Sequence, residues 1–253
     1  ASAAKEYMKI YGVLVGKKPI IFTNNDSAYD TAIEFKKNGV NPLIIDIRKN
    51  PDSPVVQEAK NLNIEIKFFH GIANTKGYKR IKSATIGKFN TDKTGYENLE
   101  EVYCDCICVS GNWTPTVHLS SQSGNKLKYN ETLDAFIPTQ PRQNETTIGA
   151  ANGSLTLNQS LEDGFKKGFQ LSNKITNKNL ESKTPTSNEK KYGRHDKFWC
   201  MPLPKKKNYK RFVDFQNDVA VSDIELAVRE GFRSIEHVKR YTTLGMATDQ
   251  GKT

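Results

Sequence analysis

The first part of the chain alternates short apolar runs with amphipathic stretches, a pattern typical of strands that alternate with helices. After the first apolar run, the stretch TNNDSAYDTAIEFKKNG places Ala28, Ala32 and Phe35 on one helical face. The predicted elements are, in order, a strand over Pro19–Phe22, a helix ending at Gly39, a strand over Leu43–Ile47, a helix from Pro54 after a Ser53 cap, and a strand over Ile64–Phe69. This order predicts a β-α-β unit.

The pattern changes to a period of two between Ile72 and Val109, which predicts an antiparallel meander that leads into a buried strand, VYCDCICVSG. A helix is expected from Leu155 to Leu171. The stretch from Ser172 to Asp196 is polar and poor in aromatic residues, so it is expected to be a linker or an extended surface wrap.

Two short helices are predicted near the carboxyl end of the chain. Ser222 with Glu225 would form a capping box for the first, Gly231 would end it, and Ser234 would cap the second. The fold class is therefore α/β, with a Rossmann-like unit and a β-meander followed by a small α-helical module. The expected domains are 1–172, a linker over 173–195 and a module over 196–253.

The charge balance adds little to this picture. The chain has 253 residues and a formal net charge of +10, and a basic face can bind nucleic acid by neutralising phosphates. The lysines are scattered, however, and the densest run is only Lys205 to Lys207. We expect a solvated, lysine-rich surface and no nucleic-acid partner. No apolar run approaches the twenty residues of a membrane helix, so no membrane partner is expected.

Three of the four cysteines are crowded into Cys104, Cys106 and Cys108. Their spacing does not suggest a disulfide framework, so we expect a cytoplasmic protein. On one strand the three thiols would share a face, whereas zinc sites usually place paired cysteines at a turn. Even with Cys200 or His195 as a fourth ligand, buried strand residues are expected here and not a metal site.

The turn after the first strand is a candidate nucleotide site. A dinucleotide fingerprint needs glycines where the backbone turns tightly, approaches the pyrophosphate and packs against the helix. The stretch FTNNDSA has Thr23, Asn25 and Ala28 at those places. Side chains occupy space that glycine leaves empty, although Asn25 adopts the left-handed conformation more easily than most residues.

Neighbouring residues leave two interpretations of this turn open. Ser27 or Asn24 could donate to an anion at the helix start. Asp46 lies at the end of the second strand, at the sequence separation from the turn that suits a residue accepting from a ribose hydroxyl. Against this, Asp26 places negative charge beside any phosphate. The turn is either a dinucleotide site or part of a Rossmann-like unit that is kept as a scaffold.

Longer motifs resemble the alpha-subunit family of heterotetrameric sarcosine oxidases. Family phrases such as RYGVxPG, VFTNNDSAY and VSGGWNPTVHLxSQSGGKLxYDExLxAF correspond to YGVLVG, IFTNNDSAY and VSGNWTPTVHLSSQSGNKLKYNETLDAF in this chain, and both contain GAANG. The resemblance covers nearly the whole chain except the polar stretch. It implies that the sequence is an internal part of a longer subunit.

The segment from Phe212 to Thr253 is similar to the two-iron, two-sulfur module of the bacterioferritin-associated-ferredoxin (BFD) type. Its closing phrase, YTTLGMATDQGK, also resembles the sarcosine oxidase family. The ligand positions are Asp214, Gln216 and Asp249. Iron–sulfur clusters are held by thiolates, so the resemblance predicts a cysteine-less module with no iron–sulfur cluster.

GAANG, from Gly149 to Gly153, resembles the GD motif of two-dinucleotide-binding flavoproteins, whose aspartate bonds a ribityl or ribose group. That position is Ala150 here, so a flavin bound in the ordinary way is not expected. The backbone amides of Gly149 and Ala151 could still face a pyrophosphate. The main GxGxxG of the family lies upstream of this sequence.

The resemblance also implies cofactors and partners. The family's alpha subunit holds NAD, FAD and FMN belong chiefly to the beta subunit and its interface, and tetrahydrofolate binds a later domain of the alpha subunit. The whole enzyme, with beta, gamma and delta subunits, demethylates sarcosine to glycine, transfers the one-carbon unit to tetrahydrofolate and releases hydrogen peroxide. In this region the implied role is a nucleotide-binding and subunit-docking scaffold, without catalytic residues.

Two alternatives remain. The alpha subunits of opine or proline dehydrogenases share the same domain order, although their module cysteines are replaced here. A protein that only binds partners is the third interpretation, and it would be favoured if the chain captured a flavoprotein without binding any nucleotide.

Overall fold

The computed structural model describes residues 1–176, 184–190, 192–193, 195–203 and 210–250. The chain divides into two compact units, one made of Ala1–Phe68 and Cys106–Lys197, the other of Phe69–Asp105 and Phe198–Thr253. The run Lys205 to Lys207 lies outside the described residues. Among the described residues, no helix combines the length and the apolar character that crossing a membrane requires.

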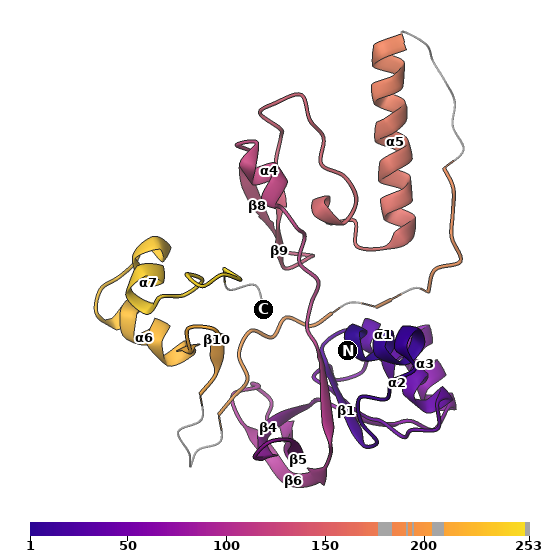
Figure 1. Ribbon diagram of the computed structural model, residues 1–253, viewed down its shortest axis with the longest axis vertical. Coiled ribbons are helices and arrows are strands. Elements are labelled where there is room, and N and C mark those ends of the chain that lie inside the picture. Colours follow the sequence, from indigo (N-terminus) through magenta and orange to yellow (C-terminus); the bar gives the residue numbers. More distant parts are fainter. Residues whose placement is uncertain (177–183, 191, 194, 204–209, 251–253) are drawn as a thin grey trace. The chain divides into compact units, whose positions relative to one another are not determined.

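The first unit is built on a parallel sheet with the strand order β3-β2-β1-β7. The bounds of its first elements are α1 Ser2–Tyr11, β1 Pro19–Thr23, α2 Ser27–Lys37, β2 Leu43–Asp46, α3 Pro54–Asn61, β3 Glu65–Phe68 and β7 Cys106–Ser110. Each connection from β1 to β2 and from β2 to β3 passes through a helix (Figure 1). The predicted β-α-β unit and the Rossmann-like α/β fold are thus confirmed.

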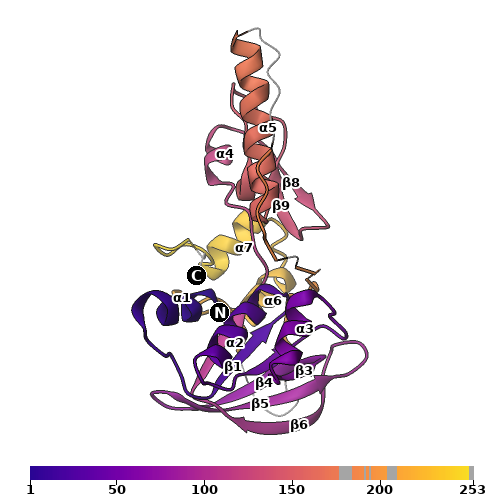
Figure 2. The ribbon, with the colours of Figure 1, turned by 90° about the vertical axis from the view of Figure 1, so that its right-hand side faces the viewer.

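The helices and strands of this unit can be followed in a second view (Figure 2). Alternate strand residues form the core with α1, α2 and α3. Ile21, Ile44 and Cys108 pack in one cluster with Phe35 and Tyr29 of α2, and all five side chains are buried. Because residues two apart share a strand face, this cluster fixes which face the helices cover. Truncating a buried phenylalanine such as Phe35 to alanine typically costs about 3–5 kcal/mol.

The same unit continues after β7 with smaller elements. They are α4 His118–Gln122, the hairpin β8 Leu127–Asn130 and β9 Ala135–Pro138, the 3-10 helix η1 Gly149–Asn152, and α5 Leu157–Thr176. The predicted helix from Leu155 therefore starts two residues later and runs five residues further. Neither α1 nor the β8–β9 hairpin is predicted from the sequence pattern.

The second unit contains the predicted meander. Its strands β4 His70–Gly77, β5 Ile81–Phe89 and β6 Tyr96–Tyr103 pair antiparallel in chain order. Rings of Phe69, Tyr96 and Phe198 lie 5.2–5.7 Å from the Phe89 ring, centroid to centroid. A methyl group on Gly71 would come within 2.5 Å of the Phe89 ring, so glycine is required at that position for the rings to pack.

The prediction of one continuous strand for VYCDCICVSG is wrong. The meander strand β6 ends at Tyr103, and β7 begins at Cys106 in the parallel sheet of the other unit. Cys104 lies between them, and its amide donates to the carbonyl of Lys82. The chain changes sheets at this point, and a period of two is common to both strands, so the pattern does not reveal the break.

The carboxyl-terminal module has strands β10 Phe212–Asp214 and β11 Val219–Ala220 and helices α6 Val221–Arg229 and α7 Ile235–Thr242. The predicted end at Gly231 and start at Ser234 are confirmed. The capping box of Ser222 with Glu225 is wrong, because the N-cap of α6 is Ala220, two residues earlier. The carboxylate of Asp223 accepts the amide of Ala220 at 2.8 Å instead.

Candidate functional site

The carboxyl end of β1 is the point where the strand order changes direction. From β1 the chain crosses to β2 on one side, whereas β7 lies on the other side of β1. Thr23 pairs in register with both Asp46 of β2 and Ser110 of β7, so the three strand ends meet at one edge of the sheet. Ligands of open α/β sheets bind outside such an edge, at the switch point.

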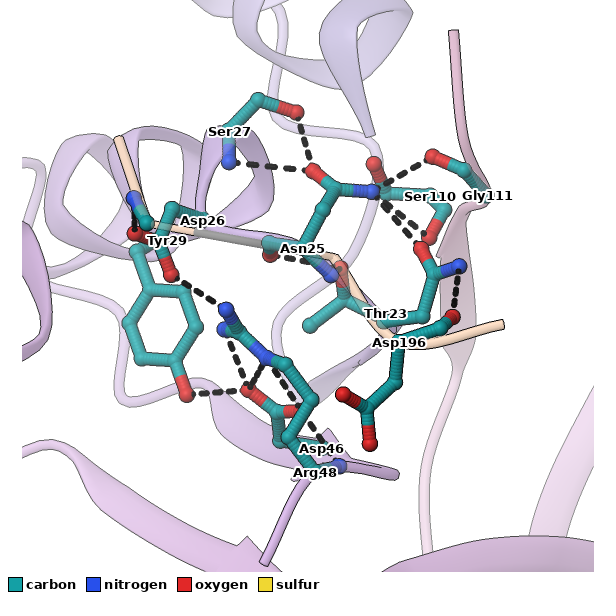
Figure 3. A network of polar contacts seen from close by, with 12 residues as sticks. Thr23, Asn25, Asp26, Ser27, Tyr29, Asp46, Arg48, Ser110, Gly111 and Asp196 are labelled. Atoms are coloured by element: carbon teal, nitrogen blue, oxygen red, sulfur yellow. Dashed lines mark hydrogen bonds and ion pairs between the residues drawn. The ribbon is translucent and has the colours of Figure 1, made fainter. Parts of the chain in front are cut away.

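Side chains brace the β1–α2 turn at this edge (Figure 3). The carboxamide oxygen of Asn25 accepts from the Ser27 amide at 3.0 Å and from its hydroxyl at 2.6 Å. The carboxamide nitrogen donates across the crevice to the carbonyls of Gly111 and Ser110, at the end of β7. The Thr23 hydroxyl donates to the carbonyl of Asn25 at 2.9 Å. The turn therefore uses polar side chains where a dinucleotide fingerprint uses glycines.

Below the turn lies a buried ion network of Asp26, Asp46 and Arg48 (Figure 3). The Arg48 guanidinium donates to the Asp46 carboxylate through Nε at 3.0 Å and Nη2 at 2.7 Å, and to Asp26 through Nη1 at 2.6 Å. The Tyr29 hydroxyl donates to Asp46 at 2.6 Å. Two carboxylates thus share one guanidinium, and neutral donors offset the remaining negative charge.

The network also sets the protonation of its members. Burial raises the pKa of the Tyr29 phenol well above its usual range, and the neighbouring Asp46 carboxylate raises it further. Burial alone would lower the pKa of Arg48, but its bonds to Asp46 and Asp26 outweigh this and raise that pKa. Tyr29 therefore stays a hydrogen-bond donor and Arg48 stays a cation.

A cavity of about 550 Å³ opens above the turn. Asn25 and Ser27 line it from the turn, Trp113 from the loop after β7, Gly153 from the end of the GAANG motif, and His195 from a later segment. The Asn112 carboxamide lies 3.1 Å from the His195 ring nitrogen Nε2 at the same cavity. Aromatic side chains, hydroxyls and amides thus surround one space, together with the carboxylates of Asp26 and Asp30.

The predicted site residues occupy three different settings. Asn25 and Ser27 line the cavity, whereas Thr23 and Asp46 are buried and do not line it. Both carboxylate oxygens of Asp46 accept from Arg48 or Tyr29, and neither is offered to a ribose hydroxyl in this arrangement. The Asn24 side chain donates to the Asp196 carbonyl at 3.0 Å.

The GAANG motif forms the η1 turn. Gly149 has a φ of +64° and Gly153 one of +89°, both in the left-handed region that favours glycine. A methyl group on Gly153 would also lie 2.5 Å from the Leu133 side chain. Gly149, Ala150 and Ala151 do not line the cavity, but Gly153 does. The motif therefore reaches the same space as the β1–α2 turn through its last residue.

Cys106 and Cys108 share a face of β7, with their sulfur atoms 3.8 Å apart. The contact with Cys106 and burial raise the pKa of the Cys108 thiol, which keeps it protonated. Among the described residues, no group of three or more histidine, cysteine or acidic side chains could hold a metal ion. Cys108 packs as a small hydrophobe in the core.

In the carboxyl-terminal module, the expected ligand position Asp214 is a buried structural acceptor. One carboxylate oxygen accepts the amides of Gln216 at 3.0 Å and Asn217 at 3.2 Å, and the other accepts the Gly245 amide at 2.7 Å. Gln216 is exposed and Asp249 is half-buried. The carboxylate thus joins the β10–β11 turn to the segment after α7.

The later segment that covers the turn was expected to be a linker or an extended surface wrap, and its contacts with the turn were not predicted. The Gly193 amide donates to the Asp26 carboxylate. The available signal was weak: a tyrosine, a glycine and a histidine follow a long polar stretch. Arg48, two residues after Asp46, was a clearer signal, because a buried carboxylate needs a nearby cation.

Comparisons with known proteins agree on one relationship. A family model described as the sarcosine oxidase A3 domain matches residues 208–253. Sarcosine oxidase subunit alpha of Corynebacterium sp. (strain U-96) is 29% identical over 258 residues, covering 100% of this chain and 26% of the relative. The same subunit of Rhizobium meliloti (strain 1021) is 30% identical over 265 residues, covering 100% and 24%. The chain spans about a quarter of the length of these curated relatives.

Among solved structures, the L-proline dehydrogenase from P. horikoshii aligns with 98% of this chain and 44% of its own. The TM-score is 0.48 and the sequence identity 14%.

Proposed function

Because the chain is similar to sarcosine oxidase alpha subunits along its whole length, as its motifs indicate, we propose that it forms the nucleotide-binding and docking part of such an oxidoreductase. The whole enzyme would remove a hydride equivalent from sarcosine to a flavin, FAD or FMN, held chiefly by a beta subunit. Oxygen would reoxidise the flavin to give hydrogen peroxide. The methyl carbon would pass to tetrahydrofolate in another domain of the longer subunit, and glycine would be released.

In this proposal the described chain holds no catalytic residue and supports binding of NAD. The observation that carries it is the cavity shared by the β1–α2 turn and the last residue of the GAANG motif. Its volume of about 550 Å³ lies within the range of roughly 300–1,000 Å³ usual for small-molecule pockets. Two of the predicted cofactor-binding residues, Asn25 and Ser27, line this space.

The lining suggests a division of roles. Trp113 is 55% exposed, so its indole is free to offer a face on which a nucleotide base could stack. Ser27 and Asn25 would bond sugar or phosphate oxygens. Asp46 would act indirectly, by holding Arg48 against Asp26 and so neutralising the charge beside the turn. Gly149, Ala150 and Ala151 would approach the ligand together with preceding parts of the longer subunit.

Titration calorimetry with NAD, FAD and FMN tests this proposal on the chain and on the longer subunit that contains it. We expect heat of binding with NAD at the longer subunit. The two tryptophans of the sequence provide a matched pair: Trp113 lines the cavity, and Trp199 is 76% exposed in the other unit.

Trp113→Ala should weaken NAD binding roughly 5- to 150-fold, the equivalent of about 1–3 kcal/mol for one stacked base. Trp199→Ala should leave it unchanged. The proposal fails if neither protein binds NAD, or if both tryptophan variants bind it as well as the parent. Capture of a flavin-bearing subunit without any nucleotide binding would support a docking role alone.

A further inference from the structure

The segment from Ser187 to Asp196 crosses the crevice at the carboxyl end of β1, and we call its described residues the strap. One end is fixed to the start of α5. The Glu189 carboxylate accepts the amides of Leu157 at 2.9 Å and Asn158 at 3.1 Å, where a helix N-terminus favours an anion. The Asn158 carboxamide also donates to the carbonyl of Ser187 and accepts from its amide. This anchor fixes where the strap begins.

The other end is fixed to β1. The Asn24 side chain donates to the carbonyl of Asp196 at 3.0 Å, and the Asp196 amide donates to the carbonyl of Asn24 at 3.2 Å. The strap therefore runs from α5 to the edge where β1, β2 and β7 end. A nucleotide bound at the switch point of this sheet would need the same edge.

Between its two ends, the strap is held by a latch to carboxylates of α2 and α3. The Lys190 ammonium lies 2.9 Å from both the Asp30 and the Glu58 carboxylates. The Tyr192 hydroxyl donates to the other oxygen of Asp30 at 2.6 Å. Burial and the Asp30 carboxylate raise the pKa of Tyr192, so its hydroxyl keeps the proton that it donates. These contacts are half-exposed, which makes them breakable.

The inner contact is made by Gly193. Its amide donates to the Asp26 carboxylate, which is only 1% exposed and also holds Arg48. A methyl group on Gly193 would lie 3.1 Å from Asp26 Oδ2 and 3.7 Å from Ser53 Cβ. A side chain at this position would require Asp26 to shift by a few tenths of an ångström, so the close contact of the strap with the turn favours glycine.

We propose that the strap is a reversible cover of the β1–α2 turn, which occupies part of the nucleotide crevice when closed and is held by Lys190, Tyr192 and Gly193. The strap lines the same cavity through Tyr192, Gly193 and His195. A half-exposed latch around a part-buried backbone hydrogen bond suits a part that opens without unfolding the unit. The identity of the excluded ligand rests on the proposed function, whereas the latch itself does not.

Hydrogen exchange tests the latch on the whole chain. The double change Lys190→Ala with Tyr192→Phe removes both latch side-chain bonds to α2. We expect the amides of Gly193 and Asp196 to exchange roughly tenfold faster or more, because one charged hydrogen bond and two half-exposed ion pairs are lost. Lys9→Ala is the matched control, since Lys9 also pairs with a carboxylate of α2, Glu34, at 3.1 Å. Unchanged exchange of Gly193 in the double variant would overturn the proposal.

Gly193→Ala gives an independent perturbation, because it crowds Asp26 and leaves the latch residues in place. Exchange at Asp196 should rise in this variant as well, and equal protection in variant and parent would count against the cover. NAD titration of the latch variant then tests exclusion of the ligand. The apparent dissociation constant for NAD should fall by the same factor by which the fraction of molecules with an open strap rises.

The outcomes separate the two proposals. Faster exchange with tighter NAD binding supports both. Faster exchange with unchanged NAD affinity shows that the strap does not exclude the ligand, and it overturns the cover. Faster exchange with no NAD binding by the parent, the variant or the longer subunit leaves the cover supported and refutes the proposed nucleotide function.

Discussion

Replacing Asp214 by asparagine should increase local opening of the carboxyl-terminal module. The asparagine side chain has almost the same size as the aspartate side chain, so packing around it changes little. Asp214 is 1% exposed, and its two oxygens accept three backbone amides, two from the β10–β11 turn and one from Gly245 after α7. A carboxamide has a single acceptor oxygen. If this oxygen stays with the turn, the carboxamide N–H₂ group faces the Gly245 amide, and two donors meet.

The expected cost follows from that geometry. A hydrogen bond to a charged acceptor is worth about 1.5–3 kcal/mol, and an unsatisfied donor adds to the loss. We therefore expect Asp214→Asn to destabilise the contact by about 2–3 kcal/mol, which corresponds to roughly 30- to 150-fold more local opening. Hydrogen exchange at Gly245 measures this opening directly.

Asp218→Asn is the control for charge and residue type. Asp218 lies in the same module, is exposed, and has a φ of +53°, which asparagine tolerates well. Its effect should stay within about 0.5 kcal/mol. Equal exchange at Gly245 in the two variants would refute the claim that Asp214 holds the turn to the segment after α7.

Two further predictions concern the buried network and the module. Tyr29→Phe removes the bond to Asp46 and should lower stability by about 1–2 kcal/mol at neutral pH. Because the folded state raises the pKa of Tyr29, its stabilising effect is complete below about pH 10 and falls as the pH rises above it. Denaturant midpoints of parent and variant should therefore converge at alkaline pH, and a constant difference would contradict the burial argument. Asp214, Gln216 and Asp249 are expected to hold no cluster, so purified longer subunit should contain no stoichiometric iron; an iron content near two per chain would overturn this.

Elements with a clear apolar period were predictable, because one face had to be buried. The helix with Ala28, Ala32 and Phe35 on one side is observed as α2, and all three residues are buried in the core. Boundaries marked by Gly231 and Ser234 were also found, since local backbone preferences set them. The expected domain boundaries at 172–173 and 195–196 and a cytoplasmic location stay predictions.

Each missed feature has its own physical cause. The break between Tyr103 and Cys106 is a change of sheet, which the alternation of side chains cannot express. The hairpin of β8 and β9 leaves several large side chains exposed, so its apolar pattern is weak. The start of α6 was misplaced because two acidic residues could serve as its capping partner.

The sequence by itself determined the alternation of strands and helices, the replacement of fingerprint glycines by Thr23, Asn25 and Ala28, and the loss of sulfur ligands in the module. These features depend on residue type and on neighbours within a few positions. Tertiary structure alone decided that Arg48 bridges two carboxylates and that Gly193 bonds Asp26 across 167 residues of sequence. A single polar residue has many available partners, and only the folding of the sheet brings one of them within bonding distance.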